Sequence, residues 1–596
     1  MKLIIINKTP WILAIFVLFQ ISCSEEWIKP QPLSFYAPEN VFTNAEGFKA
    51  LLVAMRKDLR KETHQTARCL IPNEMTISDL GATGQMNIKA AKNLILQFTP
   101  SGGELEDYSK AFTWPYESIK TCNLAISRID DISWGDKDER NKILAEAYFF
   151  RSYWYYRLIN TYGDVPFIGK EVTGARLDFY SHSRDAILDK LISDMEFAVQ
   201  YLPIQAIAGA ASKGAGNHLL TKLYLANCEF DKAIEAATRV IDGPYALMKN
   251  RFGSVANDKK RNLMWDLFRP ENISIPVNAE TILAVIDRYN APAEARSTGC
   301  LKAYSYQMNW WDPHVLDSKG KPGTVAAKPL IDTILYSNGQ QRPTPFYIYT
   351  LWNDGTYSWK NTPDLRRSNI CWLDNGELKY NRPTSVDYGK PIDWRNYAAA
   401  MDTFQFFFAS PYYKTFYPEQ DPSKVNSQGG NGDGYIFRLA ETYLLRAEAF
   451  FYEGDLSNAA KDINEVRERA HAIPVLPADV TIDYIMDESA RELYSESPRH
   501  CELTRVAYIM AKTHLSGYSM ENFSENNYFY DRVVSKNDFF RTNFYYYGNT
   551  FKIAPWHVLW PIPNSVIVAN TMGIINQNQG YFGAENNVPP LEVIEE

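Results

Sequence analysis

Residues 434–470 carry two consecutive amphipathic patterns. In the first, Ala440, Tyr443, Leu444, Ala447 and Phe451 recur with the 3.6-residue period of a helix. Gly454 and Asp455 interrupt that pattern. A second helical pattern follows, and its apolar face consists of Ala459, Ile463, Val466 and Ala470. Two helices joined by a tight turn within about 34 residues are typical of a tetratricopeptide repeat. Because one such unit cannot bury its apolar face alone, the pattern predicts further copies.

A second copy lies far upstream, at residues 217–242. In register, Ala233 falls at the position of Ala459 and Val240 at that of Val466. A third, partial match covers residues 145–159. We therefore predict helical repeats over about 111–243 and 434–515. The alternative is that these segments are unrelated amphipathic helices.

Other segments show the same helical periodicity. They span residues 44–59, 115–129, 136–159 and 184–201. Asn44 is suited to cap the first of these helices. Pro115 is suited to the first turn of the second, where its missing N–H costs no hydrogen bond. Residues 209–216 are predicted to form a loop before the second repeat.

Helical periodicity fades over residues 244–433. A strand-like apolar run covers 277–286, and turn signals such as Asn338-Gly339 and Asp354-Gly355 are frequent. This segment is too long for a structureless loop in a compact body, so we predict a functional insertion with short strands. Residues 516–596 are predicted to be an irregular C-terminal region. The predicted fold class is mainly α, with a tetratricopeptide-like scaffold and a partly β insertion in one body spanning 46–596.

The first residues have the character of an export signal. Lys2 and Lys8 precede an apolar run that is too short to span a bilayer, and Cys23 follows small residues. This arrangement is similar to a bacterial lipoprotein signal covering residues 1–22, with Cys23 acylated and residues 23–45 forming a tether. Glu25 and Glu26 are similar to a surface-export signal. The alternative is ordinary signal-peptide cleavage beside an incidental cysteine.

Composition excludes some classes of partner. Loss of Lys2 and Lys8 with the signal would change the formal net charge from −8 to −10. Such an acidic chain is unsuited to nucleic acid, whose binding depends on Lys and Arg contacts to phosphate. The six cysteines after Cys23 are scattered without a CxxC pair, so we expect buried free thiols rather than a zinc site.

Catalytic motifs are missing from the sequence. There is no GxSxG, HExxH or P-loop motif, so we predict a protein that is not an enzyme and needs no cofactor or metal. Asn431 and Asp433 could contact calcium, but a glycine-rich loop without the EF-hand pattern is the simpler interpretation.

Aromatic residues beside polar ones are frequent in the irregular segments. Aromatics make up 14% of the chain, and Tyr and Trp combine an apolar face with a polar group. Sugars stack C–H faces on such rings, while acids and amides bond their hydroxyls. The candidates in the insertion are Tyr304, Trp310, Trp311, Asp312, Trp352 and Trp359, with Trp372 beside Asp374 as a further pair. The alternative for each ring is core packing.

Motifs across most of the chain resemble the SusD/RagB family of outer-membrane nutrient-binding lipoproteins. They comprise the 116–129 helix, Tyr162-Gly163-Asp164-Val165-Pro166, the 438–449 helix, the 488–505 helix and the 561–581 tail. The 488–505 helix departs from the family pattern at Ser497 and Glu502, where the family has Gly and Asp.

The resemblance implies a SusD-like fold and a non-catalytic role. It implies a protein anchored to the outer membrane and facing the exterior, which captures glycan and delivers it to a SusC-like TonB-dependent transporter. The family's ligand site would draw on the insertion and on the segment from Tyr108 to Trp114. The repeat face would contact the transporter. Peptide capture, as in RagB-type members, and surface glycan degradation are the alternatives.

Overall fold

The computed structural model describes residues 42–64, 69–85, 88–102, 106–310, 315–326, 335, 337–374, 376–396, 404, 407–424 and 429–595. The predictions on the signal and on Cys23 lie outside these ranges. Within them, no helix is long and apolar enough to cross a membrane.

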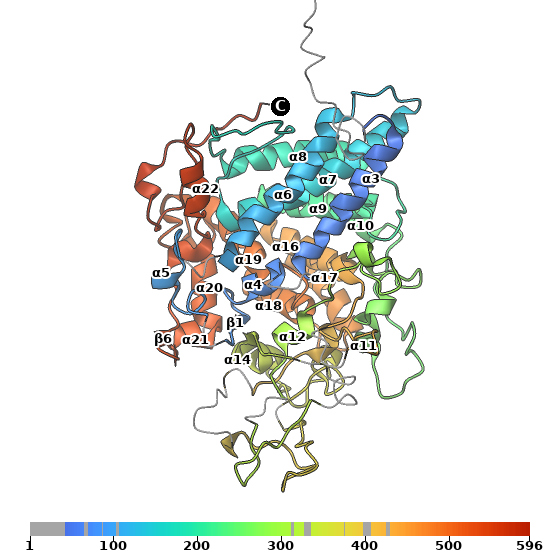
Figure 1. Cartoon of the computed structure of the whole chain (residues 1–596), viewed down its shortest axis with the longest axis vertical. Coiled ribbons are helices and arrows are strands. Elements are labelled where there is room, and N and C mark those ends of the chain that lie inside the picture. The colour runs from blue at the N-terminus through green and yellow to red at the C-terminus, as the bar shows by residue number, and fades with distance from the viewer. Residues whose placement is uncertain are drawn as a thin grey trace, which may run out of the picture.

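Long helices form one half of the molecule (Figure 1). They are α3 (Ala45–Asp58), α6 (Glu106–Arg128), α7 (Lys137–Tyr162), α8 (Arg184–Tyr201), α9 (Lys213–Ala226), α10 (Phe230–Ile241), α16 (Leu439–Tyr452), α17 (Leu456–Arg469), α18 (Ile482–Leu493) and α19 (Arg499–Lys512). Each helix from α6 to α10 packs against the next, α10 packs against α16, and α16 packs against α17. The two predicted repeats are therefore neighbours in space although the insertion separates them in sequence, and the predicted mainly helical scaffold is confirmed.

The small residues of the repeats lie where the helices meet. Ala233, Val240, Ala447, Ala459 and Val466 are fully buried. Alanine at these contacts lets two helix backbones approach closely, and larger residues fill the spaces beside them. The alignment of the two repeats therefore matches the packing.

Helix α3 begins at the predicted cap, Asn44. Asn44 Oδ1 accepts the N–H of Glu46 at 3.0 Å. Two predictions were wrong. Helix α6 begins at Glu106, so Pro115 lies inside it rather than in its first turn. Helix α9 begins at Lys213, because Ser212 caps it, so the predicted loop is shorter.

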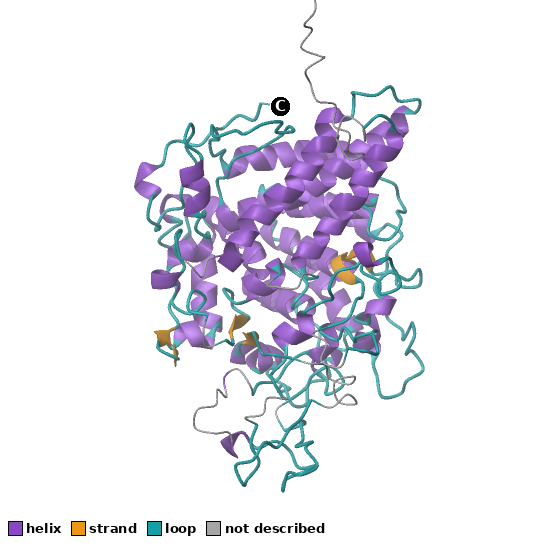
Figure 2. Cartoon of the chain, viewed as in Figure 1, coloured by secondary structure: helices purple, strands orange, loops and turns teal. Residues whose placement is uncertain are grey.

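Among the described residues, three two-stranded antiparallel pairs accompany the helices (Figure 2). They are β1 (Gly81–Thr83) with β3 (Gln341–Pro343), β2 (Thr281–Val285) with β4 (Gly434–Arg438), and β5 (Tyr545–Tyr546) with β6 (Asn549–Thr550). Strand β2 lies in the predicted apolar run. Its pairing with β4 joins the beginning of the insertion to its end, so both ends are attached to the helical layers.

The insertion occupies the end of the molecule opposite α6–α8, and loops predominate there (Figures 1 and 2). In the described part of the insertion, the α-helices are α11 (Leu263–Leu267), α12 (Lys302–Tyr306) and α14 (Pro345–Ile348). Short α-helices elsewhere are α4 (Leu70–Met75), α5 (Leu94–Gln97), α20 (Tyr528–Lys536), α21 (Asp538–Arg541) and α22 (Asn564–Ala569). Short 3-10 helices span Leu59–Glu62, Pro270–Asn272, Ala293–Ala295, Thr350–Trp352, Leu365–Arg367, Trp394–Asn396, Tyr412–Lys414, Pro477–Asp479, Leu515–Gly517, Met520–Asn522, Pro555–Val558 and Ala584–Asn586.

The six cysteines after Cys23 are free thiols, as expected. Five are buried and Cys228 is partly buried.

Candidate functional site

Many aromatic residues of the insertion form a hydrophobic core of their own. Trp310 and Trp352 belong to it and are only 2% and 3% exposed. Their indole N–H groups donate to the carbonyls of Leu335 at 2.9 Å and Tyr347 at 2.7 Å. Because their faces are covered and their polar atoms are satisfied, the prediction that Trp310 and Trp352 contact a ligand is corrected. They stabilise the insertion instead.

Tyr108 is also a core residue. Its ring packs edge-on against Phe98 and Trp560, with centroids 5.3 and 5.6 Å apart. Its hydroxyl lies 3.0 Å from Oγ1 of Thr76. The predicted loop before the helix is itself the first part of α6, so Tyr108 points into the packed interior. The prediction of Tyr108 as a ligand contact is therefore corrected as well.

Trp114 and Tyr304 keep part of their surface open. Trp114 lies further along α6, with the Lys110 ammonium 5.7 Å from its ring centroid. Tyr304 lies on α12, where burial raises the pKa of its phenol although Asn338 bonds to it. Within the described residues, no ring contact joins these two side chains to one another. Trp311 and Asp312 lie outside the described residues.

Trp359 lies in a loop that side-chain turns hold in place. Asp354 Oδ1 accepts the N–H groups of Thr356 at 3.0 Å and Tyr357 at 2.7 Å. Asn353 Oδ1 accepts the N–H of Trp359 at 2.9 Å. Such Asx turns order a loop without a helix or strand. The position of Trp359 is therefore defined although it lies outside regular structure.

The ring of Trp359 is partly exposed and supported from beneath. Tyr349 contacts it with centroids 5.0 Å apart and planes tilted by 54°. The guanidinium of Arg367 lies 4.8 Å from the same ring, and its own charge is compensated by Asp374 at 2.7 Å. We call Tyr349, Asn353, Trp359, Lys360 and Arg367 the Trp359 platform. It combines an open aromatic surface with amide and charged groups, which suits a polar ligand with apolar faces.

A second aromatic surface lies on the β5–β6 hairpin. Tyr545 is 67% exposed, and Tyr547 and Phe544 are also exposed. Phe544 stacks on Phe404 with centroids 5.3 Å apart. The sequence analysis predicted only an irregular C-terminal region here. The neighbouring Tyr546 is buried, so the pattern of rings did not distinguish exposed residues from core residues.

Comparison with known proteins identifies the family. Residues 302–581 match the group described as "SusD family", and residues 67–225 match "Starch-binding associating with outer membrane". The chain belongs to the SusD/RagB family.

Relatives agree with this assignment. "Starch-binding protein SusD" of Bacteroides thetaiotaomicron is 26% identical, over 84% of this chain and 90% of that protein. "SusD-like protein P2" of Formosa agariphila is 28% identical, but the match spans 38% of this chain and 45% of that protein. Among solved structures, "Surface glycan-binding protein A from Bacteroides thetaiotaomicron in complex with laminarihexaose" covers 90% of this chain and 99% of its own, with a TM-score of 0.61 and 17% identity.

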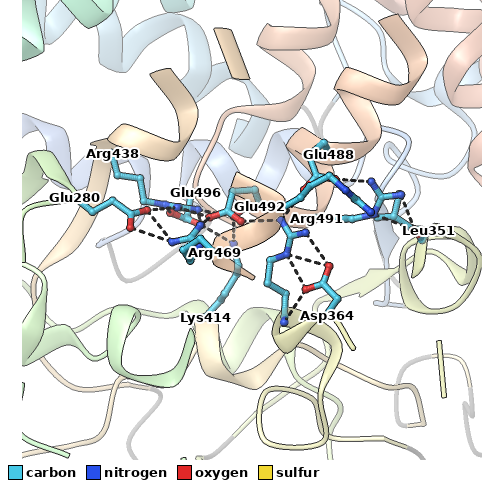
Figure 3. A network of polar contacts seen from close by, with 12 residues as sticks. Glu280, Leu351, Asp364, Lys414, Arg438, Arg469, Glu488, Arg491, Glu492 and Glu496 are labelled. Carbon is cyan, nitrogen blue, oxygen red and sulfur yellow. Dashed lines mark hydrogen bonds and ion pairs between the residues drawn. The ribbon is translucent and has the colours of Figure 1, made fainter. Parts of the chain in front are cut away.

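Charged residues of the SusD/RagB motifs join the insertion to the helical layers (Figure 3). Arg366 of the insertion contacts Glu488 and Glu492 of α18 at 2.8 Å each. Lys414, also of the insertion, contacts Glu496 at 2.5 Å. Burial lowers the pKa of Lys414 to about 8, although Glu496 opposes that shift. These motif carboxylates are therefore used in structural ion pairs.

Arg438 joins three carboxylates of this network (Figure 3). It is the last residue of β4 and contacts Glu280 at 2.8 Å, beside the start of β2. It also contacts Glu492 at 2.5 Å and Glu496 at 2.6 Å. Burial of the Glu492 carboxyl would raise its pKa, but the guanidinium groups of Arg469 and Arg438 hold that pKa well below its usual range. The network fixes both ends of the insertion against α18.

A second buried cluster of ion pairs involves other charged residues of the SusD/RagB motifs. Lys222 contacts Glu441 at 2.5 Å and Glu502 at 2.8 Å. Arg505 contacts Glu502 at 3.0 Å and Glu448 at 2.7 Å. Glu502 stands where the family pattern has Asp, and its longer side chain reaches both cations. The departure therefore leaves the ion pairs intact.

Proposed function

We propose that this protein captures glycan at the cell surface and delivers it to a SusC-like TonB-dependent transporter. The observation that carries the proposal is the alignment with starch-binding SusD over 84% of the chain. The fold shared with a laminarihexaose-bound glycan-binding protein supports it. Capture requires no bond cleavage, so the role that we propose is not enzymatic.

The Trp359 platform is the proposed ligand contact within the described residues. A sugar ring would lay its C–H face on the exposed part of Trp359. The Asn353 amide oxygen accepts the backbone N–H of Trp359, and the Lys360 ammonium lies 5.3 Å from the ring centroid. Both side chains would bond hydroxyl groups of the sugar. Trp114, Tyr304, Trp311 and Asp312 remain proposed contributors. The buried support from Arg367 means that the platform needs little reorganisation on binding, which favours affinity.

Anchoring and partner contact complete the proposal. Removal of residues 1–22 would leave acylated Cys23, and several acyl chains anchor a protein body stably. The family description associates these proteins with the outer membrane. The helices from α6 to α10 lie at the end of the molecule opposite the insertion (Figure 1). We propose that these helices contact the transporter, because this arrangement leaves the Trp359 platform free to bind ligand.

An affinity gel containing polysaccharide tests the proposal. The mature chain should be retarded by at least one member of a panel that includes starch and laminarin, without producing new reducing ends. Trp359→Ala should lose retardation. Trp394→Ala is the matched control, because Trp394 is on the insertion and 52% exposed but lies outside the platform. New reducing ends would indicate an enzyme, and binding of peptides with no retardation by any glycan would indicate RagB-type capture.

A further inference from the structure

A cleft of about 400 Å³ lies on the side of the molecule formed by α19, the start of α8 and the C-terminal segment. Its lining includes Arg184, Tyr508, Met520, Trp556, Leu559 and Asn578. None of these residues belongs to the Trp359 platform. Ligand sites of proteins commonly have volumes of about 300–1,000 Å³, so the cleft is large enough for a small ligand.

Tyr508 presents an unpaired hydroxyl to this cleft. The side chain is only 6% exposed. Its ring is held between the guanidinium of Arg184, 4.1 Å away, and the ring of Phe523, 4.4 Å away. Its hydroxyl has no hydrogen-bond partner in the part of the chain that the structure describes. Burial raises the pKa of Tyr508, so the group remains a neutral O–H. The hydroxyl oxygen itself is not enclosed, because Tyr508 lines the cleft, so the O–H can donate to an oxygen atom of a ligand there.

Gly163 keeps the space in front of Tyr508 open. A Cβ atom at this position would lie 3.1 Å from Tyr508 Oη, 3.1 Å from Leu559 Cδ1 and 3.7 Å from Asn578 Oδ1. The φ angle of Gly163 is +69°, which also disfavours other residues. Tyr508 Oη and Asn578 Oδ1 therefore both lie beside Gly163, a position that has no side chain to fill the space between them.

Asn578 is oriented so that its oxygen is available. Its amide nitrogen donates to the carbonyls of Tyr162 at 3.0 Å and Trp560 at 2.7 Å. Since both contacts require the nitrogen, the amide cannot turn over without losing them. The oxygen Oδ1 accepts no hydrogen bond from any described residue. The cleft thus offers an acceptor beside the Tyr508 donor.

Trp556 supplies an aromatic wall. Its ring lies against Gly580, where an added Cβ would be 2.3 Å from Cγ of the indole. Trp556 is only partly buried, and its indole N–H donates no hydrogen bond within the described chain. The His557 ring also stacks on this indole, with centroids 5.3 Å apart. The part of the indole that lines the cleft is left to contact a ligand.

The charges around the cleft disfavour an anion. Lys512 contacts Asp185 at 2.6 Å, and Arg184 lies 3.5 Å from the same carboxylate. The remaining acidic residues on the lining are Asp164 and Glu521. Because the cations are already paired and the other charges are negative, a neutral ligand rich in hydroxyl groups fits best.

We propose that this cleft, the Tyr508 cleft, binds a sugar residue at the end of a neutral glycan. Tyr508, Asn578 and the Trp556 N–H would bond its hydroxyls, and the Trp556 ring would stack on its C–H face. The choice of a glycan as ligand rests on the proposed function, whereas the cleft itself is separate from the Trp359 platform.

Fluorine NMR of the mature chain labelled with 5-fluorotryptophan tests the proposal. Trp556→Phe and Trp359→Phe assign the two resonances. The probes are glucose, galactose, mannose, maltohexaose and laminarihexaose, each titrated into the millimolar range. At least one probe should shift the Trp556 resonance saturably. Tyr508→Phe should weaken that binding about fivefold, as expected for loss of one hydrogen bond.

Two further variants make the result specific. Gly163→Ala should abolish the Trp556 shift, because the added methyl group would occupy the space beside the Tyr508 hydroxyl and Asn578 Oδ1, where the ligand hydroxyls would bind. Tyr518→Phe is the matched control, since the Tyr518 hydroxyl donates to Asp531 at 2.7 Å outside the cleft and should be irrelevant to binding. If Gly163→Ala fails to fold, Tyr508→Phe still decides the question.

The outcomes separate the cleft from the platform. A shift at Trp556 without one at Trp359 supports the cleft and counts against the platform. A shift at Trp359 alone, or a Trp556 shift that Tyr508→Phe leaves unchanged, overturns the cleft and leaves the proposed function standing. If no probe shifts the Trp556 resonance, the cleft proposal fails. Glycan capture by the protein is tested independently by the affinity gel.

Discussion

Arg366 and Glu492 form a hydrogen-bonded ion pair 2.8 Å long, and each side chain is only 1% exposed. Arg366 belongs to the insertion and Glu492 to α18. The pair therefore connects the segment that carries the Trp359 platform to the helical layers. In a buried network such as this one, removal of one partner leaves an uncompensated charge, which is more costly than the loss of the contact itself.

Substitution of Arg366 should destabilise the whole fold. Arg366→Met leaves Asp364, Glu488 and Glu492 short of a counter-charge, and we expect a loss of about 3–5 kcal/mol in the free energy of unfolding. Urea denaturation of the mature chain measures it. Arg395→Met is the control, because its pair with Asp393 is exposed and should contribute nothing measurable. Equal stability of the two variants would contradict the structural role of the network.

Acid should weaken the fold through Asp79. Burial alone would raise its pKa, but Arg499 and Arg532 lower it from 3.8 to about 2. A carboxyl with a lowered pKa stabilises the folded state above the unfolded value, and this contribution disappears as pH falls towards 2. We expect roughly 2 kcal/mol of unfolding free energy to be lost from this group between about pH 5 and 2. Urea titrations across that range measure the slope. A slope that stays the same in Asp79→Asn would remove Asp79 from the explanation.

Two tryptophans of the insertion should respond differently to truncation. Trp352 is a core residue, so Trp352→Ala should cost about 3–5 kcal/mol of stability. Trp359 is partly exposed, so Trp359→Ala should change the melting temperature little. It should instead weaken glycan binding by about 1–3 kcal/mol, if sugar stacking resembles base stacking. Calorimetry and the affinity gel measure the two effects. Normal glycan retardation of Trp359→Ala would move the site to the β5–β6 hairpin or to Trp114.

Larger residues at the repeat contacts should overpack them. Ala233 and Ala447 are fully buried where α10 and α16 meet their neighbours. Ala233→Leu and Ala447→Leu should each cost about 1–3 kcal/mol. Ala54→Leu serves as the control, since Ala54 is exposed on α3. Melting temperatures of the three variants test the register, which would be wrong if both buried positions tolerated leucine.

Cys23 should anchor the protein. Cys23→Ala removes the thiol that would be acylated, so the variant should leave the membrane fraction. Fractionation of cells, with salt washes but no detergent, measures this. Retention of Cys23→Ala in washed membranes would contradict the lipoprotein prediction. A companion variant, Glu25→Ala with Glu26→Ala, should stay in membranes but label less at the surface of intact cells.

The helical scaffold was predictable because its signals are local. The apolar period of residues 434–470, the cap at Asn44 and the small residues Ala233 and Ala447 each depend on neighbours within a few turns. The motifs that resemble the SusD/RagB family are similarly continuous in sequence. Errors arose where a local preference met tertiary packing, as at Pro115, which lies inside α6 rather than at its start.

The ligand-facing residues could not be chosen from the sequence for a related reason. Trp310, Trp352 and Trp359 occur in similar polar, turn-rich surroundings, yet the first two are covered by residues distant in the chain and the third is left partly open. The Tyr508 cleft is a stronger example. Gly163 is hundreds of residues away from Tyr508 and Asn578 in the sequence, and the three residues meet only when α7, α19 and the C-terminal segment pack together. Local pattern specifies helices, whereas exposure and convergence of side chains depend on contacts that are remote along the chain.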